Sequence, residues 1–126
     1  MKIEYLHEGS PDCPLIRIFD FTTSEVLLLK EHIHDLSCDS AHTFAIHDMP
    51  GVNAIGALRF TFTVGNRDVG VKGRMPDFRC EFTPSRWGEI EELINPFVVS
   101  PSMGCFQWLD DSGEVTLLLS PGNGGS

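Results

Sequence analysis

One short motif occurs twice in the sequence, and both copies stand where a strand-like segment meets a helix-like one. Residues 21–24 and 82–85 both read Phe-Thr-x-Ser and lie 61 positions apart. In the first copy, Thr22 and Glu25 have the spacing of a capping box, in which a hydroxyl and a carboxylate accept hydrogen bonds from the first backbone N–H groups of a helix. In the second copy, Pro84 occupies the first helical position, where its missing N–H costs nothing. The motif therefore predicts two helices that each follow directly after a strand.

The two predicted helices carry apolar stripes of the same spacing. Apolar residues recur at i, i+3, i+7 and i+10 in both, which is the period of one buried helix face. The first stripe is Val26, Leu29, Ile33 and Leu36, and the second, 61 positions later, is Trp87, Ile90, Ile94 and Phe97. Because similarity at a fixed period is the signature of a repeat, we predict a β-α-β-β internal duplication. The alternative explanation for the matching stripes is that any two amphipathic helices share such a spacing, without a duplication.

Alternation of apolar and polar residues predicts the strands. It is clearest at residues 58–64, where Leu, Phe, Phe and Val alternate with Arg, Thr and Thr. The other expected strands are residues 2–8, 14–22, 41–48, 77–82, 106–110 and 114–120, with a return strand through Val69 and Val71. This pattern predicts an α+β fold, with one mostly antiparallel sheet of about eight to ten short strands and both helices on one face.

The order of these elements resembles the paired β-α-β-β-β modules of the vicinal oxygen chelate (glyoxalase-like) superfamily. The resemblance lies in the element order alone. It implies a scaffold on which enzymes hold a divalent metal with His, Gln or Glu residues of the module strands. It therefore makes a metal-assisted or small-molecule enzyme the alternative function, by analogy of fold.

The length of 126 residues suits one domain. We expect residues 1–120 to form it and the Gly-rich residues 121–126 to be a flexible tail. No apolar run approaches the roughly 20 residues of a membrane span, and residues 1–4 lack the apolar core of a signal peptide. The four cysteines are widely spaced, so we expect free thiols and a cytoplasmic location.

Charge is unevenly distributed along the chain. The net charge is −9, which argues against a general nucleic-acid binder because phosphate contacts need a basic surface. Between residues 59 and 86, however, there are six Lys and Arg against three Asp and Glu, and the segments on either side are strongly acidic. Alternation places four of these cations on the polar side of neighbouring strands. These candidate binding residues are Arg59, Lys72, Arg74 and Arg79.

A basic sheet face on an acidic chain suits a small anionic ligand or the acidic surface of a protein, including a second copy of this chain. The alternative is that these charges only solubilise the face and protect a sheet edge.

Histidines and carboxylates gather in the first half of the chain, but their spacing does not favour a metal site. His32 and His34 are two residues apart on a helix and point about 200° away from each other. A site would have to combine one of them with residues further along, and the set to test is His32, His47 and Asp48. We expect no metal and no cofactor.

The sequence contains no motif for nucleophilic catalysis or phosphate binding, since G-x-S-x-G, G-x-G-x-x-G and the P-loop are all missing. Cys38 and His42 stand four residues apart in a loop, without a third group that orients the histidine. The sequence therefore favours a non-catalytic binding or protein-interaction module that is small, acidic and soluble. A structural subunit of an oligomer is the third class.

We expect a two-fold homodimer that forms through a sheet surface or a sheet edge, since closed dimers are the commonest oligomers. The chain contains nine Phe and two Trp. In the last predicted strand, Leu118 points to the opposite side from Leu117 and Leu119. That strand therefore carries an apolar residue on its polar side. We expect no membrane partner.

Overall fold

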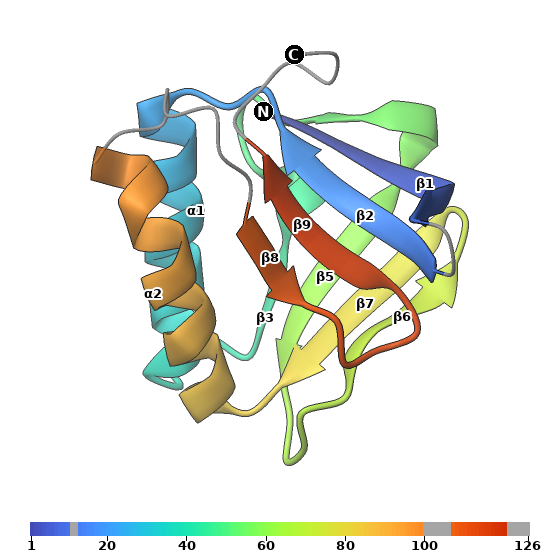
Figure 1. Cartoon of the computed structure of the whole chain (residues 1–126). Coiled ribbons are helices and arrows are strands. Elements are labelled where there is room, and N and C mark those ends of the chain that lie inside the picture. Colours follow the sequence, from blue (N-terminus) through green and yellow to red (C-terminus); the bar gives the residue numbers. More distant parts are fainter. Residues whose placement is uncertain (11–12, 100–106, 121–126) are drawn as a thin grey trace.

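Nine strands and two α-helices make up the part of the chain that the computed structural model describes, which is residues 1–10, 13–99 and 107–120 (Figure 1). The strands are β1 (Lys2–Ser10), β2 (Cys13–Phe19), β3 (Thr43–Ala45), β4 (Asn53–Ala54), β5 (Arg59–Val64), β6 (Gly70–Arg74), β7 (Asp77–Phe82), β8 (Gln107–Asp110) and β9 (Thr116–Ser120). The helices are α1 (Thr23–Ser37) and α2 (Pro84–Val99), and two short 3₁₀ turns span Ile46–Asp48 and Ile55–Ala57. The predicted α+β class and the predicted number of strands are confirmed.

The strands form two mixed sheets, so the prediction of a single sheet is wrong, although four of the seven described strand pairs are antiparallel as predicted. Sheet A has the order β4-β1-β2-β9-β8, and sheet B has the order β3-β5-β7-β6. Among the described pairs, β1 with β4, β2 with β9 and β5 with β7 are parallel. The strands that lead into the helices, β2 and β7, each pair in parallel with a strand from the other half of the chain. Each half therefore contributes strands to both sheets, which is why one sheet does not form.

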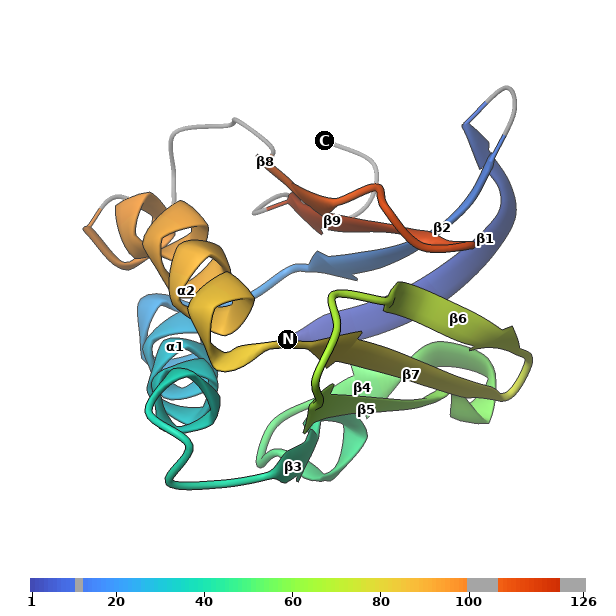
Figure 2. The same cartoon turned by 90° about the horizontal axis from the view of Figure 1, so that it is seen from below.

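Figure 2 shows sheet A above sheet B, with the two helices together at one side of both sheets. α1 packs against α2, and α2 also contacts β7 of sheet B and β8 of sheet A. The helices therefore lie together, as expected, but they cover the side of a two-sheet structure and not the face of a single sheet. Apolar residues of both sheets and both helices join in one core cluster.

The predicted start of α1 and both predicted helix stripes are confirmed. The backbone N–H of Thr22 donates to Oε1 of Glu25 at 2.8 Å, and the backbone N–H of Glu25 donates to the Thr22 hydroxyl at 3.2 Å. All eight stripe residues of the two helices are buried. Local capping and one apolar face thus determine where these helices form.

Some predicted elements differ in extent. Of the predicted strand at residues 41–48, only Thr43–Ala45 is a strand, and Ile46–Asp48 forms a 3₁₀ turn. The short strand β4 was not predicted. The expected tail at residues 121–126 lies outside the described residues, as does residue 106 at the start of a predicted strand. Neither of the described helices is long and apolar enough to cross a membrane.

The pairing of the strands follows a crossed pattern. β2 leads into α1 and pairs in parallel with β9, whereas β7 leads into α2 and pairs in parallel with β5. Two equivalent halves that exchange their last strands would produce this pattern. The duplication itself stays a prediction, because strand order alone does not show that the halves superpose.

Candidate functional site

The four candidate cations lie on the exposed face of sheet B, on three neighbouring strands. The register sets Lys72 of β6 directly opposite Arg79 of β7. Two residues away, Asp77 of β7 stands between Arg74 of β6 and Arg59 of β5. All four cations are exposed. The structure therefore brings them together as the alternation predicts, while their role in binding stays a prediction.

The four cations differ in their partners. Nε of Arg59 lies 3.4 Å from Oδ1 of Asp77, and the two side chains are 67% and 73% exposed. Such an exposed pair contributes only about 0–1 kcal/mol to stability. Lys72, Arg74 and Arg79 form no ion pair with any described residue. Because directly opposed like charges destabilise a sheet, the unneutralised pair of Lys72 and Arg79 has a cost in stability.

A hollow of about 640 Å³ lies over this part of the sheet. It is lined by Thr43, Thr61, Thr63, Lys72, Gly73, Asp77, Phe78, Arg79 and Glu114. The lining adds hydroxyl groups and two carboxylates to the two opposed cations. The hydroxyl of Thr63 already donates to the carbonyl oxygen of His42 at 3.2 Å.

The threonines and Glu114 were not among the predicted site residues. Thr61 and Thr63 were within reach of the sequence pattern, because they alternate with the apolar residues of β5 and share a face with Arg59. No sequence pattern placed Glu114 on this face. It comes from the turn before β9, where Val115 forms an isolated bridge with Val71 of sheet B.

Gly73 determines the close approach of β6 and β7, the two strands that carry Lys72 and Arg79. Its φ of +124° lies in the region that side chains disfavour. A Cβ at this position would collide with the backbone of Asp77 and Phe78. A glycine is therefore needed for the register that sets the two cations opposite each other.

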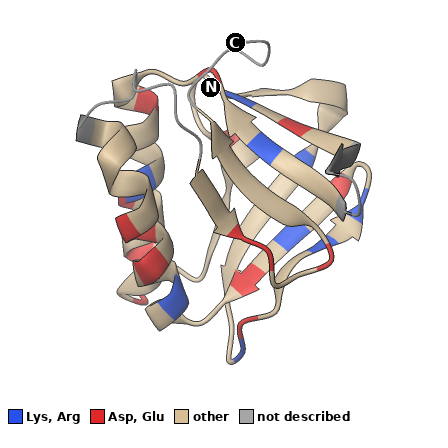
Figure 3. Ribbon diagram, viewed as in Figure 1, with Lys and Arg blue, Asp and Glu red and all other residues tan. Residues whose placement is uncertain are grey.

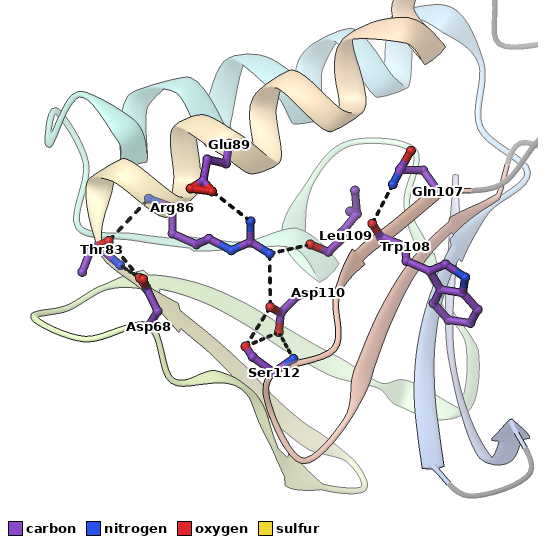
Figure 4. A network of polar contacts seen from close by, with 9 residues as sticks. All are labelled: Asp68, Thr83, Arg86, Glu89, Gln107, Trp108, Leu109, Asp110 and Ser112. Atoms are coloured by element: carbon purple, nitrogen blue, oxygen red, sulfur yellow. Dashed lines mark hydrogen bonds and ion pairs between the residues drawn. The ribbon is translucent and has the colours of Figure 1, made fainter.

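A second charged cluster joins α2 to the β8–β9 hairpin, and its groups satisfy one another (Figure 4). Nη2 of Arg86 donates to the carbonyl oxygen of Leu109 at 3.0 Å and to Oδ1 of Asp110 at 3.3 Å, while Nη1 lies 3.3 Å from Oε2 of Glu89. Ser112 donates to the same carboxylate through its hydroxyl at 2.8 Å and its backbone N–H at 3.2 Å. Arg86 is thus part of a structural junction and not of the basic face.

Cys80 lies in the core beside this junction. Burial raises the pKa of its thiol well above the ordinary value, and the charge of Asp110 raises it further against the opposing effect of Arg86. The thiol is therefore neutral and packs as a small apolar side chain. Cys38 and Cys80 are both free, as predicted; the side chain of Cys13 and all of Cys105 lie outside the described set.

The structure does not bring His32, His47 and Asp48 together as one three-residue group, although His47 lies near Asp48 and His32 lines the same hollow as Asp48. The ring of His32 stacks on Phe44, with 4.2 Å between the ring centroids. Nδ1 of His47 accepts the backbone N–H of Phe60 at 2.9 Å, and Nε2 of His47 lies 3.7 Å from Asp48. Across the described ranges, no three His, Cys, Asp or Glu side chains form a group that could hold a metal ion.

Charged residues are unevenly distributed over the elements. Most Lys and Arg lie on the strands, while Asp and Glu lie on both helices, in the β8–β9 turn and also on strands such as β7 (Figure 3).

Comparisons of the chain with models of protein families, with curated proteins and with solved structures found no match. The resemblance of element order to the glyoxalase-like superfamily therefore gains no support from these comparisons.

Proposed function

We propose that this chain is a non-catalytic binding module that takes up one compact anionic group at the exposed face of sheet B. The group is a carboxylate or phosphoryl group on a small ligand or on a partner protein. The observation that carries the proposal is that Lys72 and Arg79 stand directly opposite each other without an ion pair to any described residue. An anion between them would turn a repulsive contact into two attractive ones.

The surroundings favour a compact anion over a polyanion. Asp77 and Glu114 line the same hollow, and Glu81 follows two residues after Arg79 on β7. These carboxylates, together with the net charge of −9, would repel an extended chain of phosphates. The hollow of about 640 Å³ has the size of a small-molecule site, and its threonine hydroxyls supply uncharged hydrogen-bonding groups beside the cations.

The test is a thermal unfolding series with inorganic phosphate and with succinate, at constant ionic strength set by chloride. We expect both anions to raise the Tm of the chain, and the double variant Lys72→Gln/Arg79→Gln to lose this increase. The matched control is Arg67→Gln, which removes an exposed cation in the turn between β5 and β6. Phosphate also stabilises proteins nonspecifically, so equal increases in all three proteins would overturn the proposal.

Self-association is a second candidate function, and the exposure of Trp108 favours it. Trp108 lies on β8, the strand at one edge of sheet A among the described strands, and is 44% exposed. It stands opposite Leu118 of β9, which turns to the other face of the sheet from the buried Leu117 and Leu119. We propose a second copy of the chain as the partner of this edge, since paired edge strands give a closed two-fold contact.

The proposed compartment is the cytoplasm. Two free thiols, Cys38 exposed and Cys80 buried, support it, because exposed thiols persist in a reducing environment.

A further inference from the structure

Three side chains from two helices form a connected row at the end of α1. Sγ of Cys38 lies 3.4 Å from Nε2 of His34, and Nδ1 of the same ring lies 3.0 Å from Oε1 of Glu91 on α2. We propose that His34 and Cys38 bind a divalent ion of the zinc class as a two-residue chelate, with Glu91 orienting the histidine. Of the two histidines, His34 and not His42 contacts the thiol of Cys38, which also accepts a hydrogen bond from the Ser37 hydroxyl at 3.9 Å.

The distance between the two donor atoms fits one tetrahedral ion. Zn–N bonds of about 2.0–2.1 Å and a Zn–S bond of about 2.3 Å, opened by a tetrahedral angle, separate the two donors by about 3.6 Å. The observed separation of 3.4 Å needs only a small adjustment. Residues one helical turn apart lie on the same face of a helix, which is why His34 and Cys38 meet at the end of α1.

Glu91 supplies the support that metal-binding histidines usually have. A histidine that binds a metal through one ring nitrogen commonly donates the other N–H to a carboxylate, which fixes the tautomer and the orientation of the ring. Here, donation from Nδ1 of His34 to Glu91 leaves the lone pair of Nε2 directed toward Cys38. Lys30 lies 3.7 Å from the second oxygen of the Glu91 carboxylate and holds it from the other side.

The same row of atoms has the connectivity of a cysteine nucleophile with its base, but the electrostatics favour a bound cation. Cys38 is the C-cap of α1, and the negative end of a helix dipole attracts cations. The backbone N–H groups of residues 38–41 all donate to carbonyl oxygens of residues 34–36. They are therefore not available to stabilise the oxyanion of an acyl-transfer step.

The pair is open to solvent. His34 is 55% exposed at its side chain, Cys38 is exposed, and a hollow of about 510 Å³ between the helices is lined by His34 and Glu91. Water would complete the coordination of the ion. Binding replaces the thiol proton of Cys38, so that one Zn–S bond forms and one proton enters solution.

The experiment uses Co²⁺ as a spectroscopic probe and Zn²⁺ as its competitor. We expect one Co²⁺ per chain, a thiolate-to-cobalt charge-transfer band, proton release on binding, and loss of the band when Zn²⁺ is added. Cys38→Ser should abolish the band and His34→Asn should abolish stoichiometric binding. Glu91→Gln should weaken binding about tenfold to a hundredfold while the band persists.

The matched control is His42→Asn, which removes a neighbouring imidazole that contacts Asp39 at 3.3 Å and is absent from the chelate. It should bind Co²⁺ like the original chain. Circular dichroism and the urea midpoint test whether each variant is folded. We expect all of them to fold, because both ligand residues are exposed. A band that survives in Cys38→Ser, stoichiometric binding that survives in His34→Asn, or no binding by the original chain would overturn the proposal.

Discussion

The guanidinium group of Arg86 lies 3.3 Å from the carboxylate of Asp110 and thereby links α2 to the β8–β9 hairpin. The Asp110 side chain is only 2% exposed, and its carboxylate oxygens contact Arg86 and accept two hydrogen bonds from Ser112. The Arg86 side chain is 24% exposed and also reaches Glu89. Removing Arg86 should therefore lower the free energy of unfolding more than removing the charge of Asp110.

Arg86→Met should lower the free energy of unfolding by about 2–3 kcal/mol, because it leaves the Asp110 carboxylate buried without its cation. Asp110→Asn should cost less, about 1–2 kcal/mol, since Arg86 keeps Glu89, the Leu109 carbonyl and solvent. Urea unfolding measures both. Arg67→Met is the control, with an expected change within about 0.5 kcal/mol. Equal losses in the two junction variants would contradict this account of the pair.

Two glycine substitutions should have opposite signs. A Cβ at Gly113 would collide with the backbone N and O of Val71, where the two sheets meet. Gly113→Ala should therefore destabilise the chain by about 1–3 kcal/mol. At Gly88 in α2, the nearest atom to an added Cβ is Cβ of Ser37 at 3.9 Å, an ordinary contact. Gly88→Ala should stabilise by about 0.5–1 kcal/mol, because alanine is the better helix former. The Tm of each variant decides the signs.

Glu25 should contribute to stability in a pH-dependent way. Burial acts to raise its pKa, but hydrogen bonds from the N-terminal ammonium and from Thr22 outweigh burial and lower the pKa below the ordinary value. A lowered pKa in the folded chain means that the stabilisation is complete above the unfolded value of about 4.3 and is lost as the pH falls through the folded value. Glu25→Gln should therefore cost about 1–2 kcal/mol at pH 7 and much less near pH 3.

The control for this pH series is Glu31→Gln, which removes an exposed carboxylate of the same helix. Urea midpoints between pH 3 and pH 7 compare the two variants with the original chain. A Glu25→Gln penalty that stays constant across this range would show that the carboxylate acts through packing and not through its charge.

We predict that the chain forms a dimer and that dimer formation depends on Trp108. Light scattering at micromolar concentration should give twice the chain mass of 14.0 kDa. Trp108→Lys should give the monomer, because a lysine on an edge strand opposes pairing with another edge. Leu27→Lys is the matched control, since Leu27 is a similarly exposed apolar side chain, 40% exposed, on α1. A monomeric original chain, or a dimer in both variants, would rule out this edge as the contact.

Sequence patterns predicted the elements whose causes are local. The capping box of Thr22 and Glu25 involves residues three positions apart, and each helix stripe depends only on the helical period. The common face of Arg59 and Arg79 follows from strand alternation and needs only that β5 and β7 are neighbours. These features do not depend on which sheet a strand joins.

The same patterns could not predict how the strands pair into sheets. Alternation shows which side of a strand is buried, but it does not specify the partner strand or its direction. The pairing of β2 with β9 joins segments at opposite ends of the chain, and no residue in either segment indicates that the other is its partner. The row of His34, Cys38 and Glu91 was missed for a related reason, because Glu91 comes from the second helix and only packing of α1 on α2 brings it near.

The two sheets also differ in the time at which they can form. All four strands of sheet B lie between residues 43 and 82, whereas in sheet A Leu15 pairs with Thr116. Contacts between distant residues require closure of a long loop and are slow to form. During synthesis, sheet B can assemble as soon as β7 has left the ribosome, while β2 must wait for the arrival of β9. Until then β2 has a free edge, so the nascent chain passes through a stage in which that edge is open to the wrong partner.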